Sequence, residues 1–317
     1  MKRIRNWLRK LAVPAALGFS LLLAAGCSPT SAVESGNGRT AAAKAPFYDM
    51  ASNQGKLSIR YFHLQSQEKS GDAILITSPE GKQLLVDAGI PETGPKLEEQ
   101  LTKLGVNKLD LVVNTHPHID HIGGLTTLLH TKTVDRLIHN GIPHQTETYR
   151  KVQSILQEKQ IPHEAAAEGM KIEWSPSVSM EVLNPPQGTT PDKYEKWGTE
   201  EHNNHSLVLM MAYGDNRILL TGDLYKTQEY ALADKYGGKL KADLLHAPHH
   251  GDMTSSSGTF IKAVNPGITV LSANFLQSMD VLKRYEKEGA TVYNTGKNGH
   301  LLFVADGKTL SAYPEKP

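Results

Sequence analysis

Cysteine is almost absent from this chain, because Cys27 is the only one among its 317 residues. A single cysteine excludes an internal disulfide, and in an exported protein a lone thiol risks pairing with another molecule. The sequence also lacks short-period repeats and coiled-coil heptads, which excludes solenoid and fibrous architectures. A chain of this length can instead bury a full globular core, as one large domain or two small ones.

The N-terminal segment has the features of an export signal. Five basic side chains precede residue 11, and residues 11–26 form a nearly uninterrupted apolar stretch that is short for a membrane span. The stretch ends in Leu23-Ala24-Ala25-Gly26-Cys27, which resembles a bacterial lipoprotein signal with Cys27 as the lipidated residue. We therefore expect a signal peptide over 1–26, a Ser-, Ala-, Gly- and Thr-rich flexible tether over 27–46, and a folded domain over 47–317. The expected product is exported and lipid-anchored to the outer face of the bacterial cytoplasmic membrane.

The chain also lacks a large excess of positive charge. The whole chain has a formal net charge of +1, and loss of the five basic side chains in 1–26 changes this to −4. Because phosphate backbones recruit Lys and Arg, this balance excludes a broad nucleic-acid-binding surface. Any nucleic acid would have to be held by a local patch and by metal ions.

The remaining sequence alternates apolar strand-like runs with amphipathic helices in two similar halves. Strands running ahead of helices twice predict two packed sheets with helices outside. The predicted strands of the first half are residues 57–64, 73–77, 82–86, 109–114 and 134–139, with helices at 95–104, 125–130 and 146–159. The second half is expected to start after a loop at 185–199, with strands at 206–212, 217–221 and 243–246 and a helix at 227–235.

The most informative motif is His116-Pro117-His118-Ile119-Asp120-His121, which follows a buried-strand pattern. Neutral imidazoles and a carboxylate are the ligands that a borderline divalent metal prefers. Neighbouring ligands on one chain cannot all reach one ion with good geometry, so the spacing indicates two ions. We expect His116 and His118 on the first ion, and Asp120 with His121 on the second. Zn²⁺ is the expected metal, and Mn²⁺ would suit a more oxygen-rich site.

Three further segments place metal-ligand residues beside strands. Asp223 ends the run 217–223, where its carboxylate could bridge two cations. One of His249 and His250 is expected to bind the second ion while the other faces substrate, with His249 carried as the ligand. For the third ligand of the first ion we favour His205 over His202, with a water supported by Asn203 as the alternative. His144 and the other scattered histidines are expected to be surface or loop residues rather than ligands.

Serine side chains follow the His249-His250 pair. Ser255, Ser256 and Ser257 are expected to open a helix, where a hydroxyl and the helix N-terminus could receive a phosphate oxygen. Ordinary N-capping by one of these serines is the alternative.

Taken together, these motifs resemble the metallo-β-lactamase superfamily, whose signature is His-x-His-x-Asp-His. More narrowly, the chain resembles the soluble hydrolase domain of the ComEC/Rec2 competence proteins and their stand-alone relatives. The matching stretches are Gly71–Ile76, Leu84–Gly89, Thr115–Gly124, Asn203–Val208, Leu219–Asp223 and Pro248–Gly251. The resemblance implies an α/β fold of the αββα sandwich type, with a dinuclear site along one edge of the sandwich.

The resemblance also implies roles for residues beside the ligands. Asp87, together with Asp72, would lie next to the ligand histidines, and Asp87 would fix the tautomer of one of them. Two departures concern substrate: Glu68-Lys69-Ser70-Gly71-Asp72 replaces the usual Gly-Gln-Gly-Asp, and residues 272–279 contain no histidine. A group that contacts substrate in the family is therefore expected to be missing.

The function expected from the sequence is hydrolysis by hydroxide held between two divalent cations. We expect a phosphodiesterase or nuclease acting on DNA or a wall polymer outside the membrane, with Asp120, His249 and His250 in the catalytic centre. Lactamase, lactonase or thioesterase activity is the alternative within the same chemistry, although lactamases with a cysteine ligand are excluded. A non-catalytic surface receptor for DNA or wall polymer is the alternative of a different class. No obligate protein partner is implied.

Overall fold

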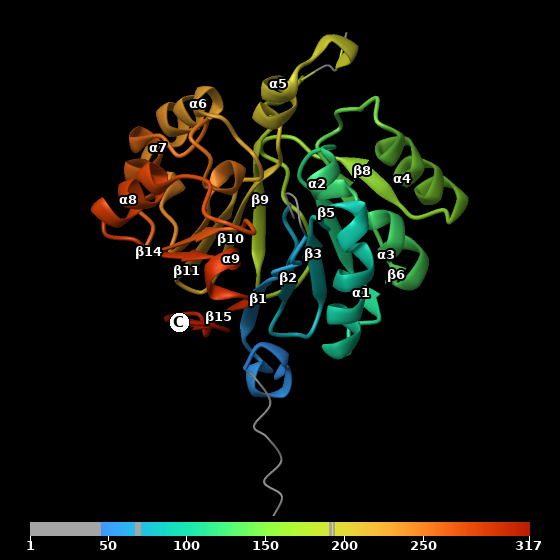
Figure 1. The fold of residues 1–317 in the computed structure, drawn as a ribbon, viewed down its shortest axis with the longest axis horizontal. Helices are drawn as coiled ribbons and strands as arrows, with labels where there is room; N and C mark the ends of the chain where they lie inside the picture. The colour runs from blue at the N-terminus through green and yellow to red at the C-terminus, as the bar shows by residue number, and fades with distance from the viewer. Residues whose placement is uncertain (1–45, 67–70, 190–191, 193) are drawn as a thin grey trace, which may run out of the picture. The chain divides into compact units, whose positions relative to one another are not determined.

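Two β-sheets lie face to face between two layers of helices in the computed structural model (Figure 1). The structure describes residues 46–66, 71–189, 192 and 194–317. The predicted signal peptide, Cys27 and nearly all of the predicted tether lie outside these residues. No helix in the described part of the chain is both long and apolar enough to cross a membrane.

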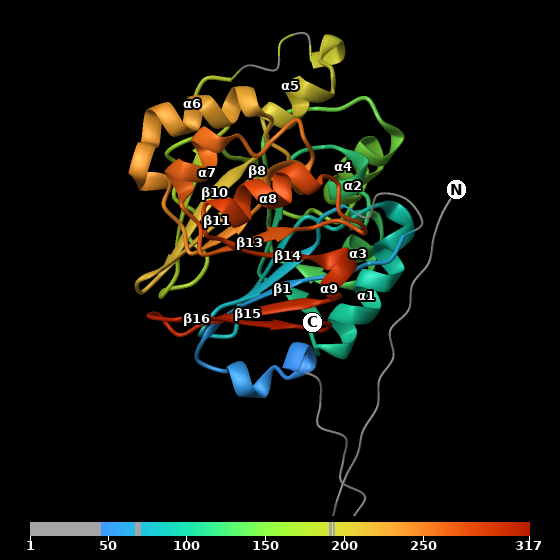
Figure 2. The ribbon, with the colours of Figure 1, turned by 60° about the vertical axis from the view of Figure 1, so that its left-hand side comes forward.

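The first sheet has eight strands and combines an antiparallel half with a parallel half. Its order across the sheet is β16 (Leu310–Pro314), β15 (Leu301–Ala305), β1 (Leu57–Tyr61), β2 (Ile74–Thr77), β3 (Gln83–Val86), β5 (Leu111–Asn114), β7 (Leu137–His139) and β8 (His163–Ala165). The strands from β3 to β8 run parallel to one another. The short helices Pro46–Tyr48 and Ala51–Asn53 lie by β15 and β1 (Figure 2).

The second sheet has six strands in the order β14 (Thr291–Asn294), β13 (Ile268–Leu271), β12 (Leu244–His246), β11 (Asn216–Leu220), β10 (Val208–Tyr213) and β9 (Ser179–Asn184). Strands β11 to β14 are parallel, and β9, β10 and β11 are antiparallel. The sequence did not predict β9, so the second sheet begins before the loop that was expected to separate the halves.

Helices cover the outer face of each sheet. Figure 1 shows α1, α3 and α4 on the side of the first sheet and α6, α7 and α8 on the side of the second. The helices are α1 (Gly94–Lys103), α2 (Ile119–Ile122), α3 (Leu125–Thr131), α4 (Glu147–Glu158), α5 (Thr199–Asn204), α6 (Lys226–Tyr236), α7 (Gly258–Val264), α8 (Met279–Lys287) and α9 (Thr295–Asn298). A two-stranded ribbon, β4 (Lys108–Leu109) with β6 (Thr133–Val134), completes the described elements.

Three apolar clusters hold these four layers together. The central cluster lies between the sheets and includes Ile59, Leu209 and Leu244, while one outer cluster lies under each helical layer. Strand β5 shows why its sequence is a continuous apolar run: Val113 faces the central cluster, and Val112 faces the outer one. The αββα fold implied by the family resemblance is confirmed.

The central cluster is expected to dominate stability. Leu209 is fully buried between the sheets, so Leu209→Ala should leave a cavity and lower the free energy of unfolding by about 2–5 kcal/mol. Urea denaturation of the purified protein measures this. Lys151→Ala, at an exposed position of α4, should change the value by no more than about 0.5 kcal/mol. Equal losses in the two variants would contradict a stability set by the inter-sheet core.

Candidate metal centre

The candidate site is built by loops that leave the carboxyl ends of parallel strands in both sheets. Asp87 follows β3, the segment 115–121 follows β5, Asp223 follows β11, and the pair at 249–250 follows β12. Gly222 allows two of these loops to meet, since its φ is +52° and a Cβ there would lie 3.0 Å from the Cβ of Thr115. Residues far apart in the sequence therefore converge at one edge of the sandwich.

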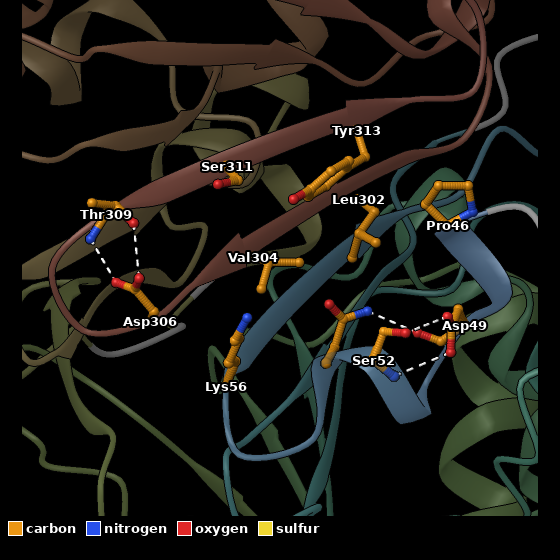
Figure 3. A pocket seen from close by; sticks show the side chains of 11 residues that line it. Pro46, Asp49, Ser52, Lys56, Leu302, Val304, Asp306, Thr309, Ser311 and Tyr313 are labelled. Atoms are coloured by element: carbon orange, nitrogen blue, oxygen red, sulfur yellow. Dashed lines mark hydrogen bonds between the residues drawn. The ribbon is translucent and has the colours of Figure 1, made fainter.

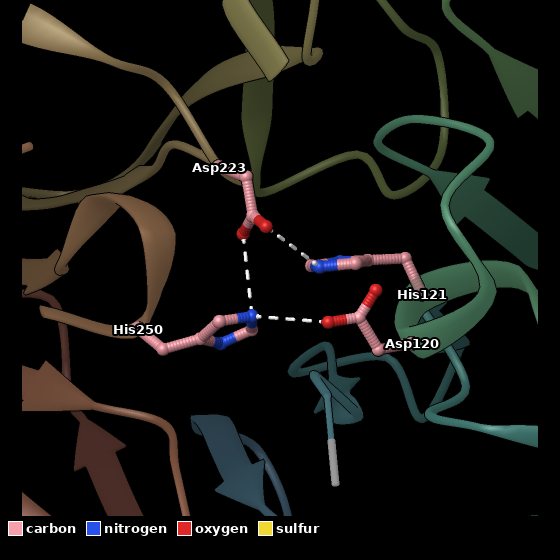
Figure 4. Close-up of side chains that lie close together, drawn as sticks. All are labelled: Asp120, His121, Asp223 and His250. Carbon is pink, nitrogen blue, oxygen red and sulfur yellow. Dashed lines mark ion pairs between the residues drawn. The ribbon is translucent and has the colours of Figure 1, made fainter. Parts of the chain in front are cut away.

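One group of side chains contains Asp120, His121, Asp223 and His250, whose potential ligand atoms all lie within 4.8 Å of one another (Figure 4). His121 Nε2 lies 3.2 Å from Asp223 Oδ2. His250 Nε2 lies 3.5 Å from Asp223 Oδ1 and 3.7 Å from Asp120 Oδ2. Two imidazole nitrogens and two carboxylates thus face a common point.

A second group contains His116, His118 and Asp223, again with ligand atoms within 4.8 Å of one another. His116 Nε2 lies 3.0 Å from His118 Nδ1 and 3.7 Å from Asp223 Oδ2. Two nitrogens on one tetrahedral zinc, each about 2.0–2.1 Å from the ion, lie on the order of 3.3 Å apart. The two groups share Asp223, so its carboxylate lies between them.

Buried polar atoms without partners test whether these residues fit divalent cations. Nε2 of His121, Nε2 of His250 and Oδ1 of Asp223 are buried and make no hydrogen bond with the described residues. Leaving such atoms unsatisfied costs about 1–3 kcal/mol each, and a cation at the point they face would satisfy all three. The residues fit divalent metal ions, with nitrogen and oxygen donors of the kind that Zn²⁺ and Mn²⁺ accept.

Asp87 fixes which ring nitrogen each histidine presents. Its fully buried carboxylate lies 2.8 Å from His121 Nδ1 and accepts hydrogen bonds from the Thr115 hydroxyl (2.6 Å), the Thr115 backbone N–H (2.8 Å) and the Asn114 side chain (3.0 Å). Because the Thr115 hydroxyl donates to Asp87, it accepts from His116 Nδ1, 3.1 Å away. In their neutral forms, both histidines therefore turn an unprotonated Nε2 toward the candidate metal positions.

Asp72 lies beside His250 much as Asp87 lies beside His121. Its carboxylate lies 3.1 Å from His246 Nε2 and 3.3 Å from His250 Nδ1, and the latter also donates to the Ser272 carbonyl at 2.9 Å. Burial raises the pKa of Asp72, but His246 and His250 outweigh it and hold the pKa well below its usual range. Gly71 permits this placement, because a Cβ at its φ of +65° would overlap the Asp120 carbonyl.

Burial also sets the protonation of the first histidine pair. It holds the pKa of His116 well below its ordinary value and lowers the pKa of His118 to about 4. Both imidazoles are therefore neutral at pH 7, which is the form that binds a cation. Burial lowers the pKa of His121 and of His250. The neighbouring carboxylates, Asp223 foremost, raise it by a larger amount, so the pKa of each imidazole lies well above its ordinary value.

The two histidines after β12 point in different directions. Both have left-handed backbones, with φ of 49° at His249 and 56° at His250, which is uncommon for residues other than glycine. His250 turns into the first group of side chains described above. His249 belongs to neither group: its Nε2 lies 3.8 Å from Asp223 Oδ2, and its Nδ1 lies 2.6 Å from the Thr254 hydroxyl. The sequence left open which of the two binds the second ion and carried His249 as the ligand, whereas the structure groups His250 with Asp120 and His121.

A cavity of about 740 Å³ opens over the site. The side chains of His118, Asp120, Asp223 and His249 form its polar floor. His144, a loop residue that belongs to neither ligand group, also lines it, with its ring 5.6 Å from that of His118. The only sequence signal for His144 was its residue type.

The predicted third ligands of the first ion lie in α5 and just after it. His205 is turned away, since its ring stacks on Trp197 at 4.6 Å and its Nδ1 faces the Glu201 carbonyl. His202 is buried with its ring 5.7 Å from that of His118, and Asn203 lines the cavity. Neither His202 nor His205 is grouped with His116 and His118, so the geometry brings no third imidazole into that group within the described residues.

The serines after the histidine pair are buried, which contradicts the expected phosphate contact. The Ser255 hydroxyl donates to the Pro248 carbonyl at 2.6 Å, and the Ser256 hydroxyl accepts from Tyr285 at 2.9 Å. Their loop is held by Glu229 of α6, a buried carboxylate that accepts the Ser257 backbone N–H at 2.7 Å. Ser257 is the N-cap of α7, so the capping alternative is the one observed.

A second hollow of about 300 Å³ lies on the outside of the first sheet (Figure 3). Its lining includes Asp49, Lys56, Asp306 and Tyr313 and none of the residues of the two groups above. Ser52 and Thr309 cap the carboxylates of this hollow through local hydrogen bonds, so its polar groups are already satisfied. It is not a candidate catalytic site.

This chain matches a protein-family model and is similar in sequence to several curated proteins. The family model described as "Metallo-beta-lactamase superfamily" matches residues 67–273. Competence protein ComA of Neisseria gonorrhoeae is 29% identical over 70% of this chain and 29% of its own length. ComE operon protein 3 of Bacillus subtilis is 30% identical over 68% of this chain and 27% of its own length. This chain thus spans less than a third of these curated relatives.

Among solved structures, the metallo-beta-lactamase fold protein YhfI from Bacillus subtilis aligns with a TM-score of 0.48 at 16% identity. The alignment covers 75% of this chain and 95% of that one.

The hydrogen bonds of Asp87 predict its effect on metal affinity. Asp87→Asn keeps the size of the side chain but replaces an acceptor oxygen with an N–H donor facing His121 or Thr115. We expect metal affinity to fall by about 10–100-fold, measured by competition with a chromogenic chelator. Asp306→Asn, at an exposed turn, is the matched control and should keep the parent affinity. An unchanged affinity in Asp87→Asn would show that the tautomers are not set by this carboxylate.

Proposed function

We propose, from the premise that this chain belongs to the metallo-beta-lactamase superfamily, that it is a metal-dependent hydrolase whose substrates are phosphodiesters. The proposed cofactors are two divalent cations, most simply Zn²⁺, with Mn²⁺ as the other candidate. His116, His118 and Asp223 would hold one cation, and Asp120, His121, Asp223 and His250 would hold the other.

The observation that carries this proposal is the shared carboxylate of Asp223. It lies within 3.7 Å of imidazole nitrogens from both groups, so one side chain connects the two adjacent groups. Paired cations about 3.5–4 Å apart, when bound, lower the pKa of water and neutralise charge on a phosphoryl oxygen during in-line displacement. This arrangement is typical of phosphatases and nucleases.

The chain's own residues would position the diester and move protons. The cavity floor would receive the scissile phosphate over Asp223, where the ligand imidazoles would exclude bulk water from the opposite side. His249 faces the same cavity, and the Thr254 hydroxyl, which donates to Asp252 at 2.8 Å, orients its ring through Nδ1. Protonated His249 would donate from Nε2 to the departing oxygen.

Hydrolysis of bis(p-nitrophenyl) phosphate tests the proposal. The protein is loaded with Zn²⁺ or Mn²⁺, and its metal content is measured by mass spectrometry. Asp120→Ala and His250→Ala each remove a proposed ligand, so we expect kcat to fall by about a hundredfold or more, with less bound metal. His205→Ala is the matched histidine control, since its ring stacks on Trp197, and it should retain both activity and metal.

Two results would overturn the proposal in different ways. Two bound ions without turnover of any phosphodiester would exclude a phosphodiesterase and direct the search to lactams, lactones and thioesters. No bound metal under saturating conditions would exclude a metal-dependent hydrolase altogether.

We further propose that the protein is exported and lipid-anchored through Cys27, because the sequence at 23–27 resembles a lipoprotein signal. Cys27→Ser removes the thiol that would carry the lipid. We expect this variant to leave the membrane fraction for the soluble fraction, or to remain as the uncleaved precursor. Fractionation detects the first outcome, and intact mass detects the second. Ser28→Ala is the neighbouring control. Identical fractionation, with a mass difference no larger than that of the Cys-to-Ser replacement itself, would exclude lipidation.

A further inference from the structure

The cavity over the metal centre has an apolar side as well as a polar floor. Ile90, Ile119 and Phe275 line it together with the ligands. Ile119 is 46% exposed and Phe275 is 56% exposed, so neither belongs to the core. Single exposed apolar side chains are ordinary on protein surfaces, but these two line the same cavity, directly beside Asp120 and His118.

The loop that carries Phe275 is fixed relative to the metal ligands. It starts at Ser272, whose carbonyl accepts the hydrogen bond from His250. The Asn274 side chain donates to the Ser66 carbonyl at 3.0 Å, and the Asn274 carbonyl packs so closely on α9 that a Cβ at Gly296 would lie 1.9 Å from it. The backbone that leads into Phe275 is therefore fixed beside the cavity.

The charges of the cavity constrain the rest of the substrate. Among the described residues that line it, the acidic side chains are Asp120 and Asp223, and there is no Lys or Arg. A polyanionic chain usually requires basic side chains along its path, one for most of the phosphates contacted. This cavity offers cation positions for one phosphate and apolar surface for the remainder of the molecule.

We propose that Phe275, with Ile119 and Ile90, forms a subsite for an aromatic ring, so that the preferred substrate is a small nucleotide diester whose base stacks on Phe275. This inference rests on the proposed phosphodiesterase activity and specifies its substrate. The residues would set specificity through KM, because base stacking contributes equally to ground-state and transition-state binding and leaves the reacting bond untouched. Diesters of glycerol or ribitol phosphate have no ring to fill the subsite.

Two diesters of equal charge separate the base from the phosphate. The first is thymidylyl-thymidine, and the second is its analogue in which tetrahydrofuran replaces both nucleosides. We expect the parent protein, loaded with metal, to show a kcat/KM for the first that is on the order of tenfold higher. Phe275→Ala should reduce this ratio to about one by raising KM, with kcat and the hydrolysis of the abasic diester unchanged. Phe275→Tyr keeps a stacking ring and should keep the ratio.

Binding and salt dependence provide readouts that do not depend on turnover. Calorimetry should show thymidine monophosphate binding more tightly than its abasic analogue to the parent protein and equally to Phe275→Ala. Added NaCl should weaken binding only slightly, because a single phosphate is neutralised.

Equal hydrolysis of the two diesters by the parent, or a ratio unaffected by Phe275→Ala, would overturn the subsite and leave the phosphodiesterase intact. A strong preference for a long oligothymidylate with a steep salt dependence would overturn the small substrate in favour of a polymer. Failure to hydrolyse these diesters and bis(p-nitrophenyl) phosphate alike would overturn the proposed function, and with it this inference.

Discussion

A single buried carboxylate, that of Asp87, organises much of this site. Burying a charge without partners is strongly unfavourable, and Asp87 is tolerated because three donor groups and the His121 ring surround it. The same bonds join the ends of β3 and β5 and orient the rings of His116 and His121. Placement of the strands and orientation of the rings therefore depend on one another, so a change that separates these strand ends would also misalign the imidazoles.

The layer order of the fold could be predicted from the sequence, but one boundary could not. Apolar runs at β3, β5, β11 and β12 were recognisable because strands of parallel sheets are buried on both faces. Strand β9, which alternates exposed and buried residues over much of its length, lies at the edge of its sheet and carries a weaker signal. Pairing with β10, which no local pattern reveals, makes it a strand.

Those parts of the candidate site that depend on residue type and on the position of strand ends could be predicted from the sequence. Those that depend on the backbone conformation of a loop could not. Nothing in the residue types of His249 and His250 says which turns inward, since two consecutive left-handed φ angles determine it. Burial of Ser255 and Ser256 depends on Glu229, a residue in another helix whose carboxylate binds their loop. His144 lies 23 residues beyond the end of the motif (144 − 121) and reaches the cavity through tertiary packing.

The contact between His250 and the Ser272 carbonyl has a consequence for how this protein can diverge over generations. A main-chain oxygen is present whatever side chain the position carries. The hydrogen bond that orients His250 therefore requires no particular side chain at position 272. Exposed positions of the loop that starts at Ser272, Phe275 among them, can therefore be substituted without removing the hydrogen bond that orients His250.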